Sequence, residues 1–298
     1  MLLFLSLSWA RSVRWLVSMT LFIFMSSAFA APKAIKLIGF WDDHEPLSAI
    51  QVNHSPWQEI LNMYVDDQHA SGINRFDYEA VTAGDALKIK NYLDYLQKME
   101  PRQLNSLEAQ AFWINLHNAI MVDKIVDAYQ SGSSRAVNRL LRGGLRTTRW
   151  NRNVVEVVFQ DISLDNIAHG ILRPIWKDPR VNFVLATGAL SGANMLKTAF
   201  DGENNEALLE QAKNDFFAHP KALRIENGRI VLNSIFDWYG EDFAPNKPAL
   251  LRYIQENAPE VTRQSMTGLS RTRFEYNWDL NAPETLFESV ENLDDDDE

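Results

Sequence analysis

The sequence contains no cysteine among its 298 residues. This absence excludes disulfide bonds, thiolate metal sites and a cysteine nucleophile. Glycine and proline are also scarce, at 13 and 11 residues, which argues against a loop-rich chain or a repeat stalk. Basic residues are outnumbered by acidic ones, 29 to 39. Unselective nucleic-acid binding is therefore not expected, because it depends on Lys and Arg neutralising phosphates.

Familiar catalytic and cofactor motifs are also missing. The sequence has no phosphate-binding glycine loop, no dinucleotide fingerprint, no paired-histidine zinc helix and no Gly-x-Ser-x-Gly elbow. Its six histidines, at positions 44, 54, 69, 117, 169 and 219, do not have metal-ligand spacing. We therefore expect neither a cofactor nor a metal, with a metal site assembled from distant parts of the chain as the alternative.

The first thirty residues have the pattern of a signal peptide. Two arginines precede an apolar run at residues 15–25, and the small residues Ala28 and Ala30 follow it. We expect cleavage between Ala30 and Ala31, export to the periplasm or the medium, and no stable membrane span afterwards. The alternative is an uncleaved N-terminal membrane anchor, for which residues 15–30 are short against the roughly 20 residues that span a bilayer.

The rest of the sequence predicts one α+β domain that is mostly helical, with a small β-sheet. Residues 31–54 form an irregular lead-in, 55–285 the domain, and 286–298 a disordered acidic tail that ends in five consecutive acids. Apolar periodicity predicts a helix that begins at Pro56, and further helices over 85–99, 107–129, 163–173, 203–217 and 248–256. Strands are expected over 75–78, 154–159 and 183–186, and in a hairpin of 222–225 and 229–232.

The helix predicted over 107–129 carries polar residues in an apolar setting. Apolar residues surround it on all sides between 111 and 122, which indicates a central, buried helix. Asn115, His117 and Asn118 then lie inside or beside the core, next to Trp113. An unpaired buried polar group costs about 1–3 kcal/mol, so these residues either fix neighbouring backbone or line a cavity.

A second polar group is expected on the helix over 163–173. Asp165, His169 and Arg173 follow one another at intervals of four residues, which places them along one helix face. An aspartate one turn before a histidine can orient the ring and raise its basicity, as a general base requires. The alternative is an ordinary surface pairing that satisfies His169 locally.

Four segments of the sequence resemble the domain of unknown function 547 family. They read FWINLHNA at 112–119, IAHGILRP at 167–174, SIFDWYGEDF at 234–243 and FEYNWDLN at 274–281. The first is similar to the family signature, which has tyrosine in place of His117. Together with the helix that contains Trp57, the resemblance extends over residues 57–281, and it implies no secure general activity.

The resemblance also shows where this chain departs from its relatives. The family pattern implies cysteines at the positions of Thr187 and Gly192, a histidine at Asn182 and an asparagine at Ala186. In typical members, the first of these cysteines and the histidine at 169 suggest a thiol-hydrolase pair. That pair is absent here, because Thr187 stands where the cysteine is expected. Threonine is a poor substitute, since its hydroxyl is a far weaker nucleophile than a thiolate.

The sequence therefore predicts an exported, non-catalytic or catalytically altered binding or accessory protein, with a small molecule or an envelope protein as its partner. The predicted pocket or polar cluster comprises Trp113, Asn115, His117, Asn118, Asp165, Arg173 and Ser191, together with His169; a purely structural network is the alternative. A hydrolase or transferase is the competing hypothesis, with His169 as base and Thr187 or Ser191 as nucleophile. A third possibility is an envelope interaction protein whose tail, 294–298, recruits a basic partner.

Overall fold

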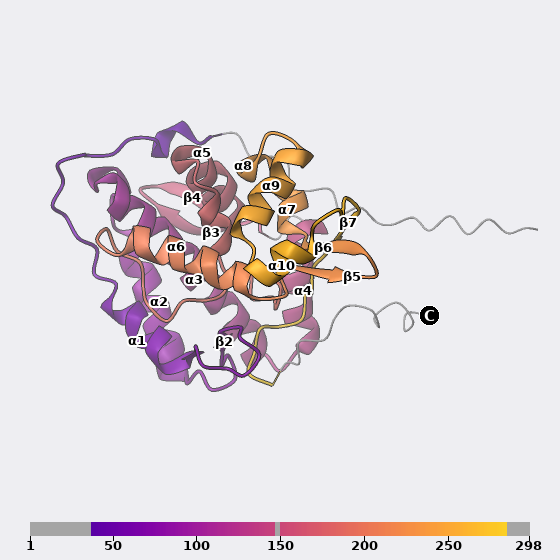
Figure 1. Ribbon diagram of the computed structural model, residues 1–298. Coiled ribbons are helices and arrows are strands. Elements are labelled where there is room, and N and C mark those ends of the chain that lie inside the picture. Colours follow the sequence, from indigo (N-terminus) through magenta and orange to yellow (C-terminus); the bar gives the residue numbers. More distant parts are fainter. Residues whose placement is uncertain (1–36, 147–149, 285–298) are drawn as a thin grey trace, which may run out of the picture.

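A computed structural model describes residues 37–146 and 150–284, and it confirms the predicted α+β fold with its predominance of helix. The helix α3 runs through the middle of the molecule, with α1 and α2 on one side and the sheet β5–β6–β7 on the other (Figure 1). The predicted signal peptide and the whole of the predicted acidic tail, 286–298, lie outside the described residues.

Helices supply most of the regular structure. The α-helices are α1 Ser55–Tyr64, α2 Ala83–Gln97, α3 Ser106–Gln130, α4 Ser134–Arg146, α5 Arg173–Trp176, α6 Asn205–Ala218, α7 Ile235–Trp238, α8 Gly240–Phe243, α9 Lys247–Asn257 and α10 Glu260–Ser265. Short 3₁₀ turns are η1 Gly39–Trp41, η2 Pro101–Gln103 and η4 Pro179–Phe183, and η3 Asn166–Leu172 is a π-helix. None of the helices in the described ranges combines the length and apolar character needed to cross a bilayer.

The strands form three small sheets. They are β1 Val65–Asp66 with β2 Arg75–Phe76, β3 Asn153–Val157 with β4 Gln160–Ser163, and the set β5 Leu223–Glu226, β6 Arg229–Asn233 and β7 Thr272–Glu275. The predicted hairpin is confirmed in β5–β6, where Asn227 and Gly228 both have the positive φ that a tight two-residue turn requires. β7 pairs parallel to β6, a partner that local sequence does not reveal.

The helix α3 is the buried centre that its apolar sequence predicted. Asn105 caps its first turn by accepting a hydrogen bond from the Glu108 amide. The buried Glu108 carboxylate accepts from the backbone amides of Val52 and Gly202, each at 2.7 Å. These bonds attach the N-terminal lead-in and the segment before α6 to the central helix.

The helix predicted to stop before Pro174 continues to Trp176. Proline cannot donate the backbone hydrogen bond that would bind the carbonyl of Gly170 in an α-helix. That carbonyl instead accepts from the Ile38 amide at 2.9 Å, and residues 166–172 widen into a π-helix. The prediction of a stop was wrong because a distant segment satisfies the group that proline leaves free.

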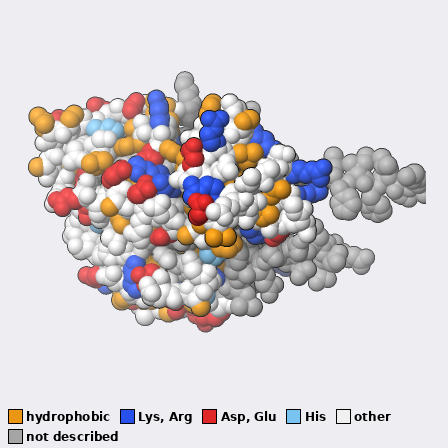
Figure 2. All heavy atoms as spheres, viewed as in Figure 1, with side chains coloured by type: hydrophobic (Ala, Val, Ile, Leu, Met, Phe, Trp, Pro, Cys, Tyr) orange, Lys and Arg blue, Asp and Glu red, His pale blue; other side chains and the backbone are white. Residues whose placement is uncertain are grey.

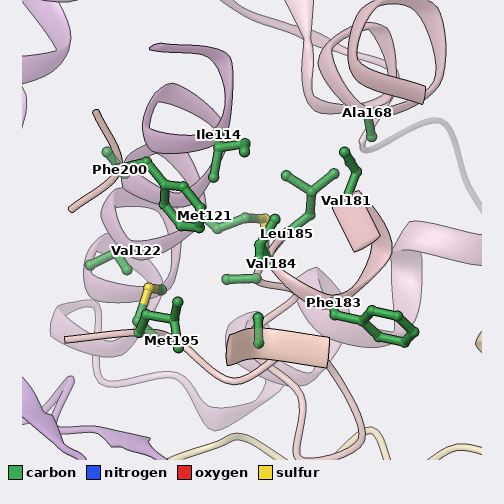
Figure 3. Packing of buried hydrophobic residues seen from close by; sticks show 14 of the residues in the cluster. Ile114, Met121, Val122, Ala168, Val181, Phe183, Val184, Leu185, Met195 and Phe200 are labelled. Atoms are coloured by element: carbon green, nitrogen blue, oxygen red, sulfur yellow. The ribbon is translucent and has the colours of Figure 1, made fainter. Parts of the chain in front are cut away.

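The strand predicted over residues 183–186 does not form. Phe183 is the last residue of η4, and residues 184–186 follow as irregular, buried backbone. Val184 and Leu185 lie beside Ile114 and Met121 of α3 (Figure 3). The polar backbone groups of this stretch bind the side chain of Asn118 in place of a neighbouring strand: Asn118 donates to the Val184 carbonyl and accepts from the Ala186 amide, both at 2.9 Å. An apolar run indicates burial, and here the burial occurs without a sheet.

Acidic and basic side chains lie interspersed on the face shown in Figure 2, with hydrophobic side chains scattered between them. One ion-pair group joins η4 to α6: Arg180 contacts Asp178 at 2.6 Å and Glu206 at 2.7 Å. Exposed pairs of this kind contribute little to stability individually, about 0–1 kcal/mol.

Candidate functional site

A small cavity lies where the π-helix, the segment after η4 and the C-terminal segment of the domain meet. Its volume is about 50 Å³. Aromatic side chains form much of its wall: Trp150, Trp238, Tyr239, Tyr276 and Trp278. The polar side chains on its lining are His117, His169, Arg173, Asn182 and Thr187. Three of these five polar residues, His117, His169 and Arg173, belong to the cluster that the sequence analysis proposed, and Thr187 is one of the two nucleophiles that it proposed.

His169 is held by a guanidinium rather than by a carboxylate. Arg173 donates from Nη1 to Nδ1 of His169 at 2.9 Å, and it binds both carboxylate oxygens of Asp242, at 2.6 and 2.9 Å. Since arginine is always protonated, Nδ1 of His169 must carry the lone pair and Nε2 the hydrogen. Burial, followed by the positive charge of Arg173 and the proximity of the titrating ring of His117, lowers the pKa of His169 to about 3. The ring is therefore a neutral hydrogen-bond donor toward the cavity, which it lines.

Asp165 does not have the orienting position that helical spacing predicted. Asp165 precedes the π-helix η3, whereas the next pair at the same four-residue interval, His169 and Arg173, does come into contact. Asp165 forms no hydrogen bond with His169, and burial raises the pKa of its carboxyl to about 6. Asp242 provides the carboxylate instead, and it acts on His169 only through Arg173.

His117 has the opposite arrangement of its ring nitrogens. The Asn118 amide is oriented by two backbone groups, so its Oδ1 faces Nδ1 of His117, at 3.3 Å. Nδ1 must then carry the hydrogen, which leaves Nε2 as an acceptor. Burial lowers the pKa of His117 to about 4, so this ring is also neutral at pH 7.

Thr187 lines the cavity, whereas Ser191 is used elsewhere. The Thr187 hydroxyl pairs with the phenol of Tyr276 at 2.9 Å, and burial raises the pKa of that phenol above its ordinary range. The hydroxyl of Ser191 is buried and accepts from the Asn277 amide at 2.8 Å. Of the two nucleophiles proposed from the sequence, only Thr187 therefore borders the cavity.

Trp113 and Asn115 belong to the core rather than to the cavity lining. Trp113 packs edge-on against Trp41, with ring centroids 5.0 Å apart. Asn115 binds the backbone of Phe200 twice, donating to its carbonyl at 2.7 Å and accepting from its amide at 3.2 Å. Asn115 and Asn118 thus fix neighbouring backbone, and Asn118 also orients a cavity residue.

Sequence reasoning missed the aromatic wall and the residues that support it. Asn182 donates from Nδ2 to Asp242 at 2.9 Å and to the Pro179 carbonyl at 3.2 Å. Asp242, Trp238 and Trp278 all occur in the two C-terminal segments that carry the family resemblance. The family resemblance of those segments could have indicated that these residues belong to the site, although it did not show which side chains come into contact.

Within residues 37–146 and 150–284, no group of three or more histidine or acidic side chains is placed to hold a metal ion. The model of the family described as "Protein of unknown function, DUF547" matches residues 101–217. The match includes α3, the π-helix and Thr187, and it lies inside the predicted 55–285 domain. Comparison with curated proteins and with solved structures finds no match.

Proposed function

We propose that the protein is an exported, non-catalytic binding protein. Because the family whose model matches residues 101–217 is described as one of unknown function, this proposal rests on the geometry of the site. Its ligand is a small molecule whose end group enters the cavity lined by His117, His169 and the aromatic wall. An aromatic wall with a few fixed polar groups is typical of small-molecule sites.

The hydrogen bond from Arg173 to Nδ1 of His169 is the observation that carries this proposal. A general base needs a free lone pair and a pKa near the working pH. His169 has its lone pair occupied by a guanidinium and a pKa lowered to about 3. A ring held in this way is suited to donate a hydrogen bond to a ligand.

The export part of the proposal rests on the basic, apolar and small-residue pattern of the first thirty residues. Mass spectrometry of the protein expressed from its full gene should give a chain that begins at Ala31 and fractionates with the periplasm. A chain that keeps Met1 and stays with the membrane fraction would favour the uncleaved anchor.

A ligand screen by thermal shift tests the binding function. A ligand of the cavity should raise the Tm of the wild type but not that of Ala193→Leu, because Ala193 lines the cavity and a leucine side chain fills it. Ala80→Leu, at an exposed position, is the matched control and should respond like the wild type. A ligand that shifts all three proteins equally, or a screen that shifts none, contradicts the proposal.

A hydrolase or transferase is the second candidate, favoured by the presence of Thr187 and two neutral histidines on one cavity lining. It predicts that a hydroxyl-reactive electrophile labels Thr187, that Thr187→Val is not labelled, and that His169→Ala abolishes labelling. If the wild type stays unlabelled under conditions that modify an authentic threonine nucleophile, this candidate is rejected.

A further inference from the structure

The two histidines of the cavity present opposite hydrogen-bonding characters to a ligand. His169 offers Nε2–H, because its Nδ1 accepts from Arg173. His117 offers the lone pair of Nε2, because its Nδ1–H points to Asn118. Burial lowers the pKa values of both rings well below neutrality, so this pairing of one donor and one acceptor persists at pH 7.

Asn182 adds a second acceptor. Its Nδ2 is committed to Asp242 and the Pro179 carbonyl, which leaves Oδ1 as the remaining polar atom of a residue that lines the cavity. The one formal charge on the lining, the Arg173 guanidinium, is already paired with Asp242 in a two-pronged contact. The polar end of the cavity therefore combines a donor with acceptors and has its charge compensated.

The size of the cavity limits what enters it. At about 10–15 Å³ for each water, a volume of about 50 Å³ accommodates roughly three to five waters. That space fits a group of a few heavy atoms and excludes a whole sugar ring or amino acid. The aromatic wall, with Trp238 and Trp278 stacked at 5.7 Å, supplies apolar contact for the carbon part of such a group.

Charged groups match this lining poorly. A carboxylate has acceptors only, and it would face the lone pairs of His117 and Asn182. An ammonium has donors only, and it would face the N–H of His169 beside Arg173. A charge that is buried without matching partners is strongly unfavourable.

We propose that the cavity binds an uncharged carboxamide, whose carbonyl accepts from His169 and whose N–H donates to His117. This inference rests on the proposed binding function and names the group that the site selects. A carboxamide of this size occurs in the acetamido group of an N-acetylated sugar and in the side-chain amide of glutamine.

Three fragments of similar size test this selection: acetamide, acetate and ethylammonium. Each is titrated at pH 7 into the full protein while NMR records the ring nitrogen resonances of His117 and His169. Acetamide should bind at least about tenfold more tightly than either ion, a difference of about 1.4 kcal/mol. It should also perturb both rings. His169→Phe should weaken acetamide binding, whereas His54→Phe, at a buried histidine bonded to Tyr92 and outside the cavity lining, should not.

Two further pairs identify the source of the amide, namely N-acetylglucosamine against glucosamine and glutamine against glutamate. Preference for the amide in either pair supports the proposal and identifies the source. If acetate or ethylammonium binds in the cavity as tightly as acetamide, the carboxamide proposal is overturned while the binding function stands. If no fragment or screened ligand of any charge perturbs the cavity histidines, both are overturned.

Discussion

Gly192 lies so close to Thr187 that a side-chain carbon at position 192 would overlap the threonine hydroxyl. The same carbon would lie 3.0 Å from the carbonyl of Ala189 and 3.3 Å from the phenol oxygen of Tyr276. The family resemblance implies cysteines at both positions 187 and 192. The two positions are thus in direct contact in this fold, and the chain places a hydroxyl at one and leaves the other without a side chain.

This contact predicts that Gly192→Ala destabilises the protein by about 1–3 kcal/mol, the usual cost of adding a carbon to a packed site. The Thr187–Tyr276 hydrogen bond should break at the same time, since the hydroxyl must move. Chemical denaturation measures the change. Thr187→Ala should relieve part of it, so the double variant should be more stable than the sum of the single effects predicts.

Gly39→Ala is the matched control, because open space surrounds Gly39. If Gly192→Ala is as harmless as the control, or if the two substitutions at 187 and 192 add without coupling, the contact does not constrain this loop.

The tautomer of His169 gives a second prediction. Replacing Arg173 with Met removes both the donor to Nδ1 and a nearby positive charge, so the pKa of His169 should rise toward its ordinary value. NMR of the ring nitrogens across pH 3–8 should show a neutral Nε2–H ring down to about pH 4 in the wild type, and protonation at higher pH in the variant. Arg180→Met, which removes a surface ion-pair residue, should leave the titration of His169 unchanged.

Arg173→Met should also lower the free energy of unfolding. Breaking a buried ion pair by removing one partner typically costs 3–5 kcal/mol, and the Arg173 side chain is only 7% exposed. If Arg173→Met leaves both stability and the His169 titration as in the wild type, Arg173 does not hold the ring in its tautomer.

The burial of Lys221 predicts that the stability of the fold depends on pH in the alkaline range. Its ammonium is buried and donates to the Gly192 carbonyl at 2.8 Å and to Asn194 at 2.6 Å, and burial lowers its pKa to about 7. Between this value and the ordinary 10.5, the unfolded chain binds a proton that the folded chain does not. Stability should therefore rise with pH through this window, by up to about 1.4 kcal/mol per pH unit.

Urea unfolding at intervals from pH 7 to 9.5 measures the effect. Lys221→Met should lose this part of the slope, because a methionine carries no titrating proton. Lys88→Met, at a surface lysine paired with Glu59, should keep the slope of the wild type. Equal slopes in the wild type and in Lys221→Met would show that Lys221 titrates normally in the fold.

The parts of the fold that could be predicted depend on local physics. The turn at Asn227–Gly228 was predictable because the two residues themselves favour positive φ. The continuation of the helix past Pro174 was not, because the amide that binds the freed carbonyl belongs to Ile38, far away in the sequence. The absence of a strand at Val184 was unpredictable for the same reason, because its carbonyl accepts a hydrogen bond from the side chain of Asn118, 66 residues earlier, and not from a neighbouring strand.

The same distinction between local and long-range contacts applies to the candidate site. His117, His169, Arg173 and Thr187 were identifiable by residue type and by family resemblance, and all four lie on one cavity. Their roles were not identifiable, since the carboxylate that fixes Arg173 comes from Asp242, 69 residues away. Helical spacing suggested Asp165 instead, but the same four-residue interval pairs His169 with Arg173, and Asp165 forms no hydrogen bond with the ring.

Asn115 and Asn118 give a matched pair for the last prediction, because they lie one helical turn apart on α3 and each binds backbone outside it. Alanine at either position leaves one carbonyl and one amide unpaired in the core, at a cost of about 1–3 kcal/mol for each group. Both variants should therefore be destabilised to a similar degree.

Amide hydrogen exchange separates the two roles under conditions where both variants remain folded. Asn118→Ala should speed exchange at Ala186, beside Thr187, and leave Phe200 protected. Asn115→Ala should expose the Phe200 amide and leave Ala186 protected. The Asn118 variant should also bind ligands of the cavity more weakly, because it no longer holds the segment that carries Thr187 and no longer fixes the tautomer of His117. The Asn115 variant should bind them as the wild type does. Equal loss of binding in both variants would mean that general loosening of the core, rather than the Asn118 contacts, controls the cavity.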